Sequence, residues 1–127
     1  MSRKILLLVV SLAAMLVACG CGDNRLLSIQ VVPVNPSLTT NNIVYIAPGS
    51  NVQYQIIGWY SNRNSQTIIG AQGHWSSSNT AIATVDGNGL ATSAGPVGET
   101  TVTVTVGGTK ATSILSVCDP LVSFCPP

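Results

Sequence analysis

Charge is scarce in this chain of 127 residues. Only 7% of the residues are Asp, Glu, Lys or Arg, aromatic residues make up 5%, and there is a single histidine. A catalytic triad or a metal site built on His74 would need partners, and no carboxylate lies near it in the sequence. Paired carboxylates, a nucleophile–base pair and a phosphate-binding loop are also missing. We therefore expect no enzyme activity, no cofactor and no metal.

The chain also lacks an apolar run that could cross a bilayer. The longest, Ile5–Val17, is thirteen residues long, whereas a spanning helix needs about 20. It follows the basic pair Arg3-Lys4, which is the order of regions in a signal peptide. It ends in Leu16-Val17-Ala18-Cys19, which resembles the lipobox of bacterial lipoproteins.

This resemblance implies that residues 1–18 are removed and that Cys19 becomes the acylated first residue. An ordinary secretory signal is the alternative. Cys21 is a weaker candidate for lipidation, because the residues before it lack the branched residue of the lipobox. Several acyl chains, at about 0.8 kcal/mol per buried CH₂, would anchor the protein permanently. The membrane is thus one expected partner.

The residues around Cys19 also bear on the location. Gly20 stands where an Asp would signal retention in the inner membrane, so the resemblance implies the outer membrane in a Gram-negative host. In a Gram-positive host the anchor would sit in the single membrane. Residues 19–25 form a short linker, and the five residues 20–24 span at most about 18 Å when fully extended. The folded part is therefore expected close to the bilayer.

No basic surface suited to nucleic acid is expected in the mature chain. Beyond residue 18 the net charge is −1, from three cations, Arg25, Arg63 and Lys110, and four acids, Asp23, Asp86, Glu99 and Asp119. Binding to a phosphate backbone needs clustered Lys and Arg residues. We therefore expect no nucleic-acid partner.

From Leu26 onward the sequence consists of short β-favouring runs separated by turns. Alternation predicts inward faces made by Leu27, Ile29 and Val31, by Val52, Tyr54 and Ile56, and by Val102, Val104 and Val106. Gly107-Gly108 has the composition of a two-residue hairpin turn, and Thr109–Val117 returns from it. Residues 38–42 are polar and turn-like. Because no helical periodicity follows the signal, we predict an all-β antiparallel sandwich of about seven short strands.

The stretch Trp75–Thr92 is the centre of this pattern. Trp75 is expected in the core, and the polar residues 76–79 are expected to form hydrogen bonds between strands. Asp86-Gly87-Asn88-Gly89 is predicted to be a turn. A calcium loop is the alternative, but the further oxygen ligands that such a loop needs are missing.

Several pieces in order resemble bacterial immunoglobulin-like domains of group 2, the Big family. They are Ser28-Ile29-Gln30-Val31 with Pro33, Pro48-Gly49, Trp75–Asn79, Ile82–Asp86, Gly89–Thr92, Gly98 and Thr101–Val104. The resemblance implies an immunoglobulin-like β-sandwich over residues 26–117, of a kind found in surface proteins that include adhesins. It brings no catalytic residues. It implies structural, adhesion or protein-interaction roles at the cell surface.

Two features lie outside that framework. Trp59 adjoins a loop and is a weak candidate for binding carbohydrate or peptidoglycan, which is the alternative function; an accessory subunit of an envelope complex is a further one. Cys118 and Cys125 bracket six residues in the tail 118–127, and we predict a disulfide between them, since an exported chain meets an oxidising compartment. Cys21 is then left over.

Overall fold

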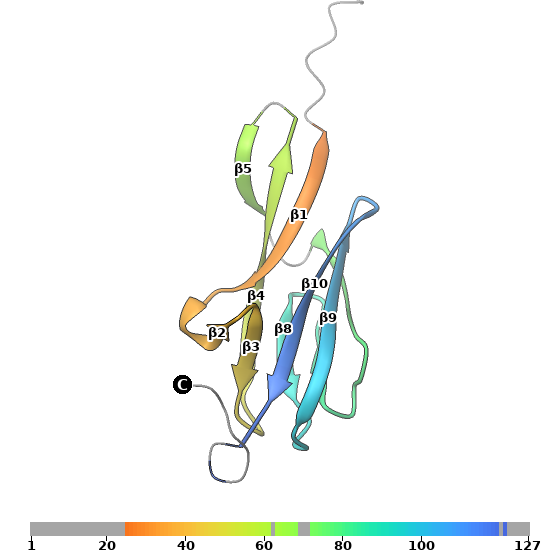
Figure 1. The fold of residues 1–127 in the computed structure, drawn as a ribbon. Helices are drawn as coiled ribbons and strands as arrows, with labels where there is room; N and C mark the ends of the chain where they lie inside the picture. Colours follow the sequence, from red (N-terminus) through yellow and green to blue (C-terminus); the bar gives the residue numbers. More distant parts are fainter. Residues whose placement is uncertain (1–24, 62, 69–71, 120, 122–127) are drawn as a thin grey trace, which may run out of the picture.

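The computed structural model describes residues 25–61, 63–68, 72–119 and 121, which fold into two facing five-stranded β-sheets (Figure 1). In the first sheet the order is β1-β4-β8-β7, with β5 paired to β4. The second sheet has the order β2-β3-β10-β9-β6. The first comprises β1 (Leu26–Pro33), β4 (Asn51–Tyr60), β5 (Arg63–Ile68), β7 (Ala83–Val85) and β8 (Leu90–Ser93). The second comprises β2 (Thr39–Thr40), β3 (Ile43–Ile46), β6 (His74–Ser77), β9 (Gly98–Val106) and β10 (Thr109–Val117).

The predicted all-β sandwich is confirmed. The described residues contain no α-helix, and one 3₁₀ turn, η1 (Pro36–Leu38), links β1 to β2. Very short strands such as β2 raise the strand number above the predicted seven, since β2 lies in a segment expected to be a turn. In the part of the chain that the structure covers, no helix is long and apolar enough to cross a membrane.

Alternating residues fill the space between the sheets. Val52, Tyr54 and Ile56 of β4 are at most 3% exposed, as the alternation predicted. Val102 and Val104 of β9 are fully buried opposite them, whereas Val106 is only partly buried near the end of its strand. Burial of each large aliphatic side chain contributes about 1.5–3 kcal/mol to folding. These alternating positions therefore determine which face of each strand turns inward.

The inward face predicted for β1 is wrong at Leu27. Ile29 and Val31 are buried, but Leu27 is 58% exposed. The pairing of β1 with β4 is regular from Ser28 onward and shifts between Leu26 and Ser28, as a β-bulge does. A bulge adds one residue to a strand and so breaks the two-residue alternation. Leu27 therefore points away from the core.

The pairing of β3 with β10 is parallel, whereas the sequence predicted only antiparallel neighbours. Ile43–Ile46 runs alongside Ile114–Val117 in the same direction, and Cys118 N donates to the carbonyl oxygen of Ile46 at 3.0 Å. On its other edge β10 pairs antiparallel with β9. The last strand therefore lies in the middle of the second sheet.

Both hairpin turns next to this sheet rely on positive φ angles. Gly107 and Gly108 have φ values of 53° and 83°, as a two-residue turn of this twist requires, so the predicted hairpin forms between β9 and β10. Asn41 and Asn42, with φ values of 52° and 65°, make the equivalent turn between β2 and β3. Asn is the non-glycine residue that best tolerates this conformation.

The polar segment after Trp75 forms hydrogen bonds to β9, as predicted. Thr100 is 3% exposed, and its hydroxyl lies 2.7 Å from the hydroxyl oxygen of Ser77 and accepts from Asn79 N at 2.9 Å. The hydroxyl oxygen of Ser78 accepts from Thr101 N at 2.9 Å. These bonds hold the segment on the edge of the second sheet, so these polar side chains have a structural role.

Candidate binding groove

Residues suited to catalysis are dispersed in the fold. His74 is exposed on the edge strand β6, where its backbone pairs with that of Thr105. Among the described residues, no three His, Cys, Asp or Glu side chains gather as a metal site would require.

Asp86 shapes the turn between β7 and β8. Its Oδ1 accepts hydrogen bonds from Asn88 N at 2.8 Å and Leu90 N at 2.9 Å. Gly89 follows with a φ of 81°, a conformation that glycine adopts without steric cost. One carboxylate oxygen thus binds the backbone of its own loop, which is turn chemistry of the kind predicted for this segment.

A groove of about 690 Å³ opens along β1. Its walls come from β1, η1, β2, the β2–β3 turn, β3, β4 and β10, some of which are far apart in the sequence. β1 is the edge strand of the first sheet, and it lies against β10 of the second sheet without pairing to it. The groove is therefore the seam between the two sheets at the β1 side. Its volume falls within the range of small-molecule sites, roughly 300–1,000 Å³.

Neutral polar groups make up half of the groove lining. Residues 31–34, Pro36 and Val44 supply the apolar part, while the polar residues are Gln30, Thr39, Asn42, Gln55, Thr112 and Ser113. Among the residues that the structure describes, no Asp, Glu, Lys, Arg or aromatic side chain lines it. Amides and hydroxyls can donate and accept hydrogen bonds without attracting an ion. The groove is therefore suited to an uncharged ligand.

Thr39 contributes a hydroxyl that lacks a partner. Its Oγ1 is buried and makes no hydrogen bond with any described residue. An unsatisfied buried hydroxyl destabilises a fold by about 1–3 kcal/mol, and such groups are uncommon. A ligand hydroxyl or a water molecule in the groove would satisfy it.

The Tyr54 hydroxyl lies next to the groove residue Ser113. Burial raises the pKa of Tyr54, and the nearby Ser113 hydroxyl lowers it in part. The contact with Ser113 does not reach the geometry of a full hydrogen bond, so the Tyr54 hydroxyl also stays unsatisfied among the described residues. On its other side the Tyr54 ring lies 6.2 Å from the Trp75 ring, centroid to centroid. Tyr54 therefore connects the groove to the core.

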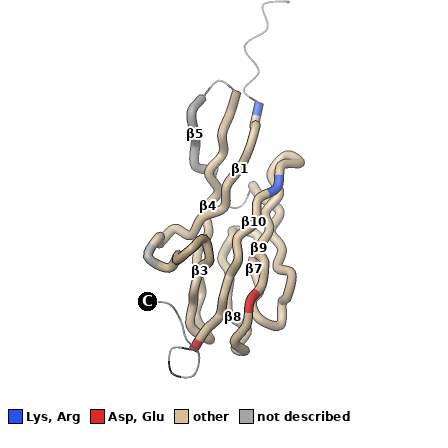
Figure 2. Tube along the Cα trace, viewed as in Figure 1, with Lys and Arg blue, Asp and Glu red and all other residues tan. Residues whose placement is uncertain are grey.

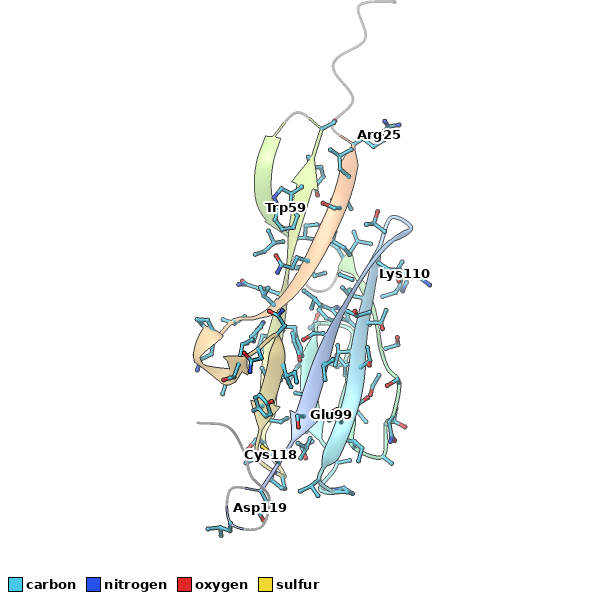
Figure 3. All side chains as sticks on the ribbon, in the orientation of Figure 1. Arg25, Trp59, Glu99, Lys110, Cys118 and Asp119 are labelled. Carbon is cyan, nitrogen blue, oxygen red and sulfur yellow. The ribbon has the colours of Figure 1, made fainter. Side chains whose placement is uncertain are left out.

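The site residues predicted from the sequence lie elsewhere. Trp59 is half-buried on β4, opposite Ser28 of β1, and does not line the groove (Figure 3). Cys118 is 7% exposed at the end of β10. Cys19, Cys21 and Cys125 lie outside the described residues, so lipidation and the Cys118–Cys125 disulfide stay predictions.

Nothing in the sequence indicates the groove, because each segment of its lining contributes ordinary strand or turn residues. Pro33 and Pro36 fit an edge strand or a change of sheet, because proline donates no backbone hydrogen bond. The chain leaves the first sheet there and enters the second.

Comparison with known proteins places this fold in a family. The sequence matches the bacterial Ig-like domain (group 2) over residues 33–115, about two-thirds of the chain. It is 33% identical over 101 residues to "Ice-binding protein 1" of Shewanella frigidimarina (strain NCIMB 400), covering 80% of this chain. The chain spans only 10% of the length of that curated relative. The family match runs from the end of β1 into β10, and the chain belongs to the bacterial Ig-like domain (group 2) family.

Proposed function

We propose that this protein is a non-enzymatic lipoprotein of the bacterial cell envelope. It presents one Ig-like domain at the membrane for structural, adhesion or protein-interaction roles. The observation that carries this proposal is the order of the sequence: a lipobox ending at Cys19 stands only a short linker before β1, which begins at Leu26. The chain covers a tenth of the ice-binding relative, so ice binding is not part of the proposal.

Mass spectrometry of the mature N-terminus tests the anchor. We expect residues 1–18 to be absent and Cys19 to carry acyl chains, and we expect the protein in the membrane fraction. Cys19→Ala should leave the signal uncleaved and the mass without acyl chains. Cys21→Ala is the matched control and should change neither the cleavage of the signal nor the acylation of Cys19. An unmodified Cys19, or cleavage at another bond, would contradict the proposal.

The groove supports a second function, the binding of an uncharged carbohydrate such as the N-acetylglucosamine units of peptidoglycan. Its support is the uncharged lining of amides and hydroxyls, together with the unpartnered Thr39 hydroxyl. Sugars present many hydroxyl groups, which bind to side chains of this kind. Under this alternative the groove, rather than Trp59, is the binding site.

Titration with N-acetylglucosamine oligomers, which are uncharged, followed by NMR chemical shifts, separates the two sites. Thr39→Val and Gln55→Ala should weaken binding at the groove, while Trp59→Ala should leave it unchanged. The reverse pattern would assign binding to Trp59. If millimolar oligosaccharide shifts no resonance, carbohydrate binding is refuted. In that event, crosslinking in cells, which would capture an envelope partner, tests the remaining role as an accessory subunit.

A further inference from the structure

The few charges of this domain are separated along its length. Figure 2 shows the described cations, Arg25 and Lys110, toward the end where the N-terminal segment leaves the sandwich. Glu99 and Asp119 lie toward the opposite end (Figure 3). With so few charges on the chain, this separation gives the domain one basic end and one acidic end.

The third cation lies at the same end by its backbone position. β5 begins at Arg63, whose backbone pairs with that of Tyr60, and Tyr60 pairs in turn with Leu26. All three Lys and Arg residues beyond Cys19 therefore belong to this end. Asp23 in the linker offsets one of them. We call the surface of Arg25, Leu27, Trp59 and Lys110 the basic end.

The remaining acid, Asp86, is in the β7–β8 turn. Its Oδ1 accepts from the backbone nitrogens of Asn88 and Leu90. Its charge is therefore partly balanced by the N–H groups of its own turn. It does not neutralise the cations of the basic end by an ion pair.

The point where the linker joins the domain is fixed. Arg25 N donates to the hydroxyl oxygen of Ser61 at 3.1 Å, and the carbonyl oxygen of Arg25 accepts from Ser61 N at 2.9 Å. These two bonds tie the last residue of the linker to the residue that follows β4. Residues 20–24 then reach at most about 18 Å toward an anchor at Cys19. The basic end is thus the part of the domain nearest to the anchor.

Apolar and aromatic side chains accompany the cations. Leu27 is 58% exposed at the bulge in β1, and Trp59 is half-buried on the neighbouring strand. Tryptophan favours the boundary between lipid and water, because its ring is apolar and its N–H is polar. Lys and Arg side chains near a membrane surface are attracted to anionic headgroups.

We propose that the basic end rests on anionic phospholipid headgroups of the membrane that holds Cys19, so that Glu99 and Asp119 face away from it. This inference rests on the proposed lipid anchor and adds an orientation to it. The tether keeps the basic end near the headgroups, and charge attraction selects that end as the contact. The sheet edges and the groove then stay accessible beside the membrane.

The test uses the mature acylated protein reconstituted into vesicles of phosphatidylcholine or of phosphatidylcholine mixed with phosphatidylglycerol. Nitroxide groups on the lipid headgroups quench nearby tryptophan fluorescence. We expect stronger quenching in the vesicles with phosphatidylglycerol, and loss of this difference in the double variant Arg25→Gln/Lys110→Gln. High salt should also remove the quenching difference, because the electrostatic screening length is about 8 Å at physiological ionic strength and becomes shorter as salt is added.

Two controls make the result specific. The double variant Glu99→Gln/Asp119→Asn also removes two charges, but at the opposite end of the domain. It should keep the difference in tryptophan quenching between the two kinds of vesicle. Trp59→Phe should remove most of the quenching difference, because the remaining tryptophan, Trp75, lies in the body of the domain. Equal quenching in both lipids, or equal loss in the acidic-end variant, overturns the orientation. Failure of the protein to float with either vesicle overturns the anchor itself, so the two failures are distinguishable.

Discussion

The indole ring of Trp75 covers the backbone of Gly89. A Cβ atom at Gly89 would lie 2.6 Å from Cζ2 and 3.0 Å from Cε2 of that ring. Gly89 also has a φ of 81°, in the left-handed region. Both residues belong to the stretch on which the family resemblance depends, and this contact explains why a glycine follows the Asp86 turn.

Gly89→Ala should therefore destabilise the domain. The left-handed backbone costs an alanine about 1–2 kcal/mol, and the clash with the indole adds about 1–3 kcal/mol. We expect the free energy of unfolding in urea to fall by roughly 2–5 kcal/mol. Gly87→Ala is the matched control in the same turn, because its added Cβ meets nothing within 4 Å. Equal losses in the two variants would contradict this account.

The buried hydroxyl of Thr100 gives a second stability prediction. Thr100→Val keeps the shape of the side chain but leaves Asn79 N and the Ser77 hydroxyl without this partner. Both groups are at least partly exposed, so the loss of these hydrogen bonds should destabilise the domain by about 0.5–1.5 kcal/mol. Thr103→Val, on the outward face of the same strand, should change unfolding by less than about 0.5 kcal/mol. Thermal unfolding of both variants checks the difference, and no loss in Thr100→Val would refute it.

The sequence predicted the parts of the fold that depend on neighbouring residues. The alternation at Val102 and Val104 and the turn at Gly107-Gly108 arise from local patterns, and the structure confirms them. Leu27 shows where such patterns fail. A bulge changes which residues of a strand point toward the core without altering the composition of the strand. Nothing in the residues around Leu27 therefore indicates the bulge.

Features that join distant segments of the chain could not be predicted from the sequence. The parallel pairing of Ile43–Ile46 with Ile114–Val117 depends on how the chain crosses between the sheets, and periodicity carries no information on that. The groove has the same origin, since Thr39 and Thr112 meet only through this topology. Trp59, the candidate proposed from its position near a loop, lies outside the groove.

Tyr54 provides a prediction on pH. Burial raises the pKa of its hydroxyl above the ordinary value of 10.0. As the pH rises above this value, the unfolded chain loses the proton before the folded one, so ionisation favours unfolding. The contribution of Tyr54 to the free energy of unfolding is thus fully present below about pH 10, and it is lost as the pH rises through the pKa of Tyr54 in the folded protein.

Tyr54→Phe should remove this part of the pH dependence. We expect the wild-type protein to lose more unfolding free energy than the variant between about pH 9 and about pH 11. Near neutral pH the variant should be as stable as the wild type or more so, because the hydroxyl it lacks is unsatisfied among the described residues. Urea unfolding of both proteins at the two pH values measures this. Equal losses of unfolding free energy in the two proteins would exclude Tyr54 as the source of this pH dependence.

The predicted Cys118–Cys125 disulfide is tested by peptide mapping without reductant. We expect one linked peptide that separates on reduction, and its absence in Cys125→Ser. The loop-entropy relation gives about 2.5 kcal/mol for a ring of eight residues. The measured stabilisation should be smaller, because the bridge closes only the tail after β10. A mixed disulfide with Cys21, or a free thiol at Cys125, would contradict the pairing.

The position of β10 affects how the domain can be made. β10 is the last strand, yet it separates β3 from β9 and joins both into one sheet. Until Thr109–Val117 has been synthesised, β2 and β3 cannot join the rest of that sheet, and the apolar faces of both sheets stay open. A chain that has not yet emerged as far as Thr109 therefore holds the strands of the second sheet in two separate parts, and only Thr109–Val117 unites them.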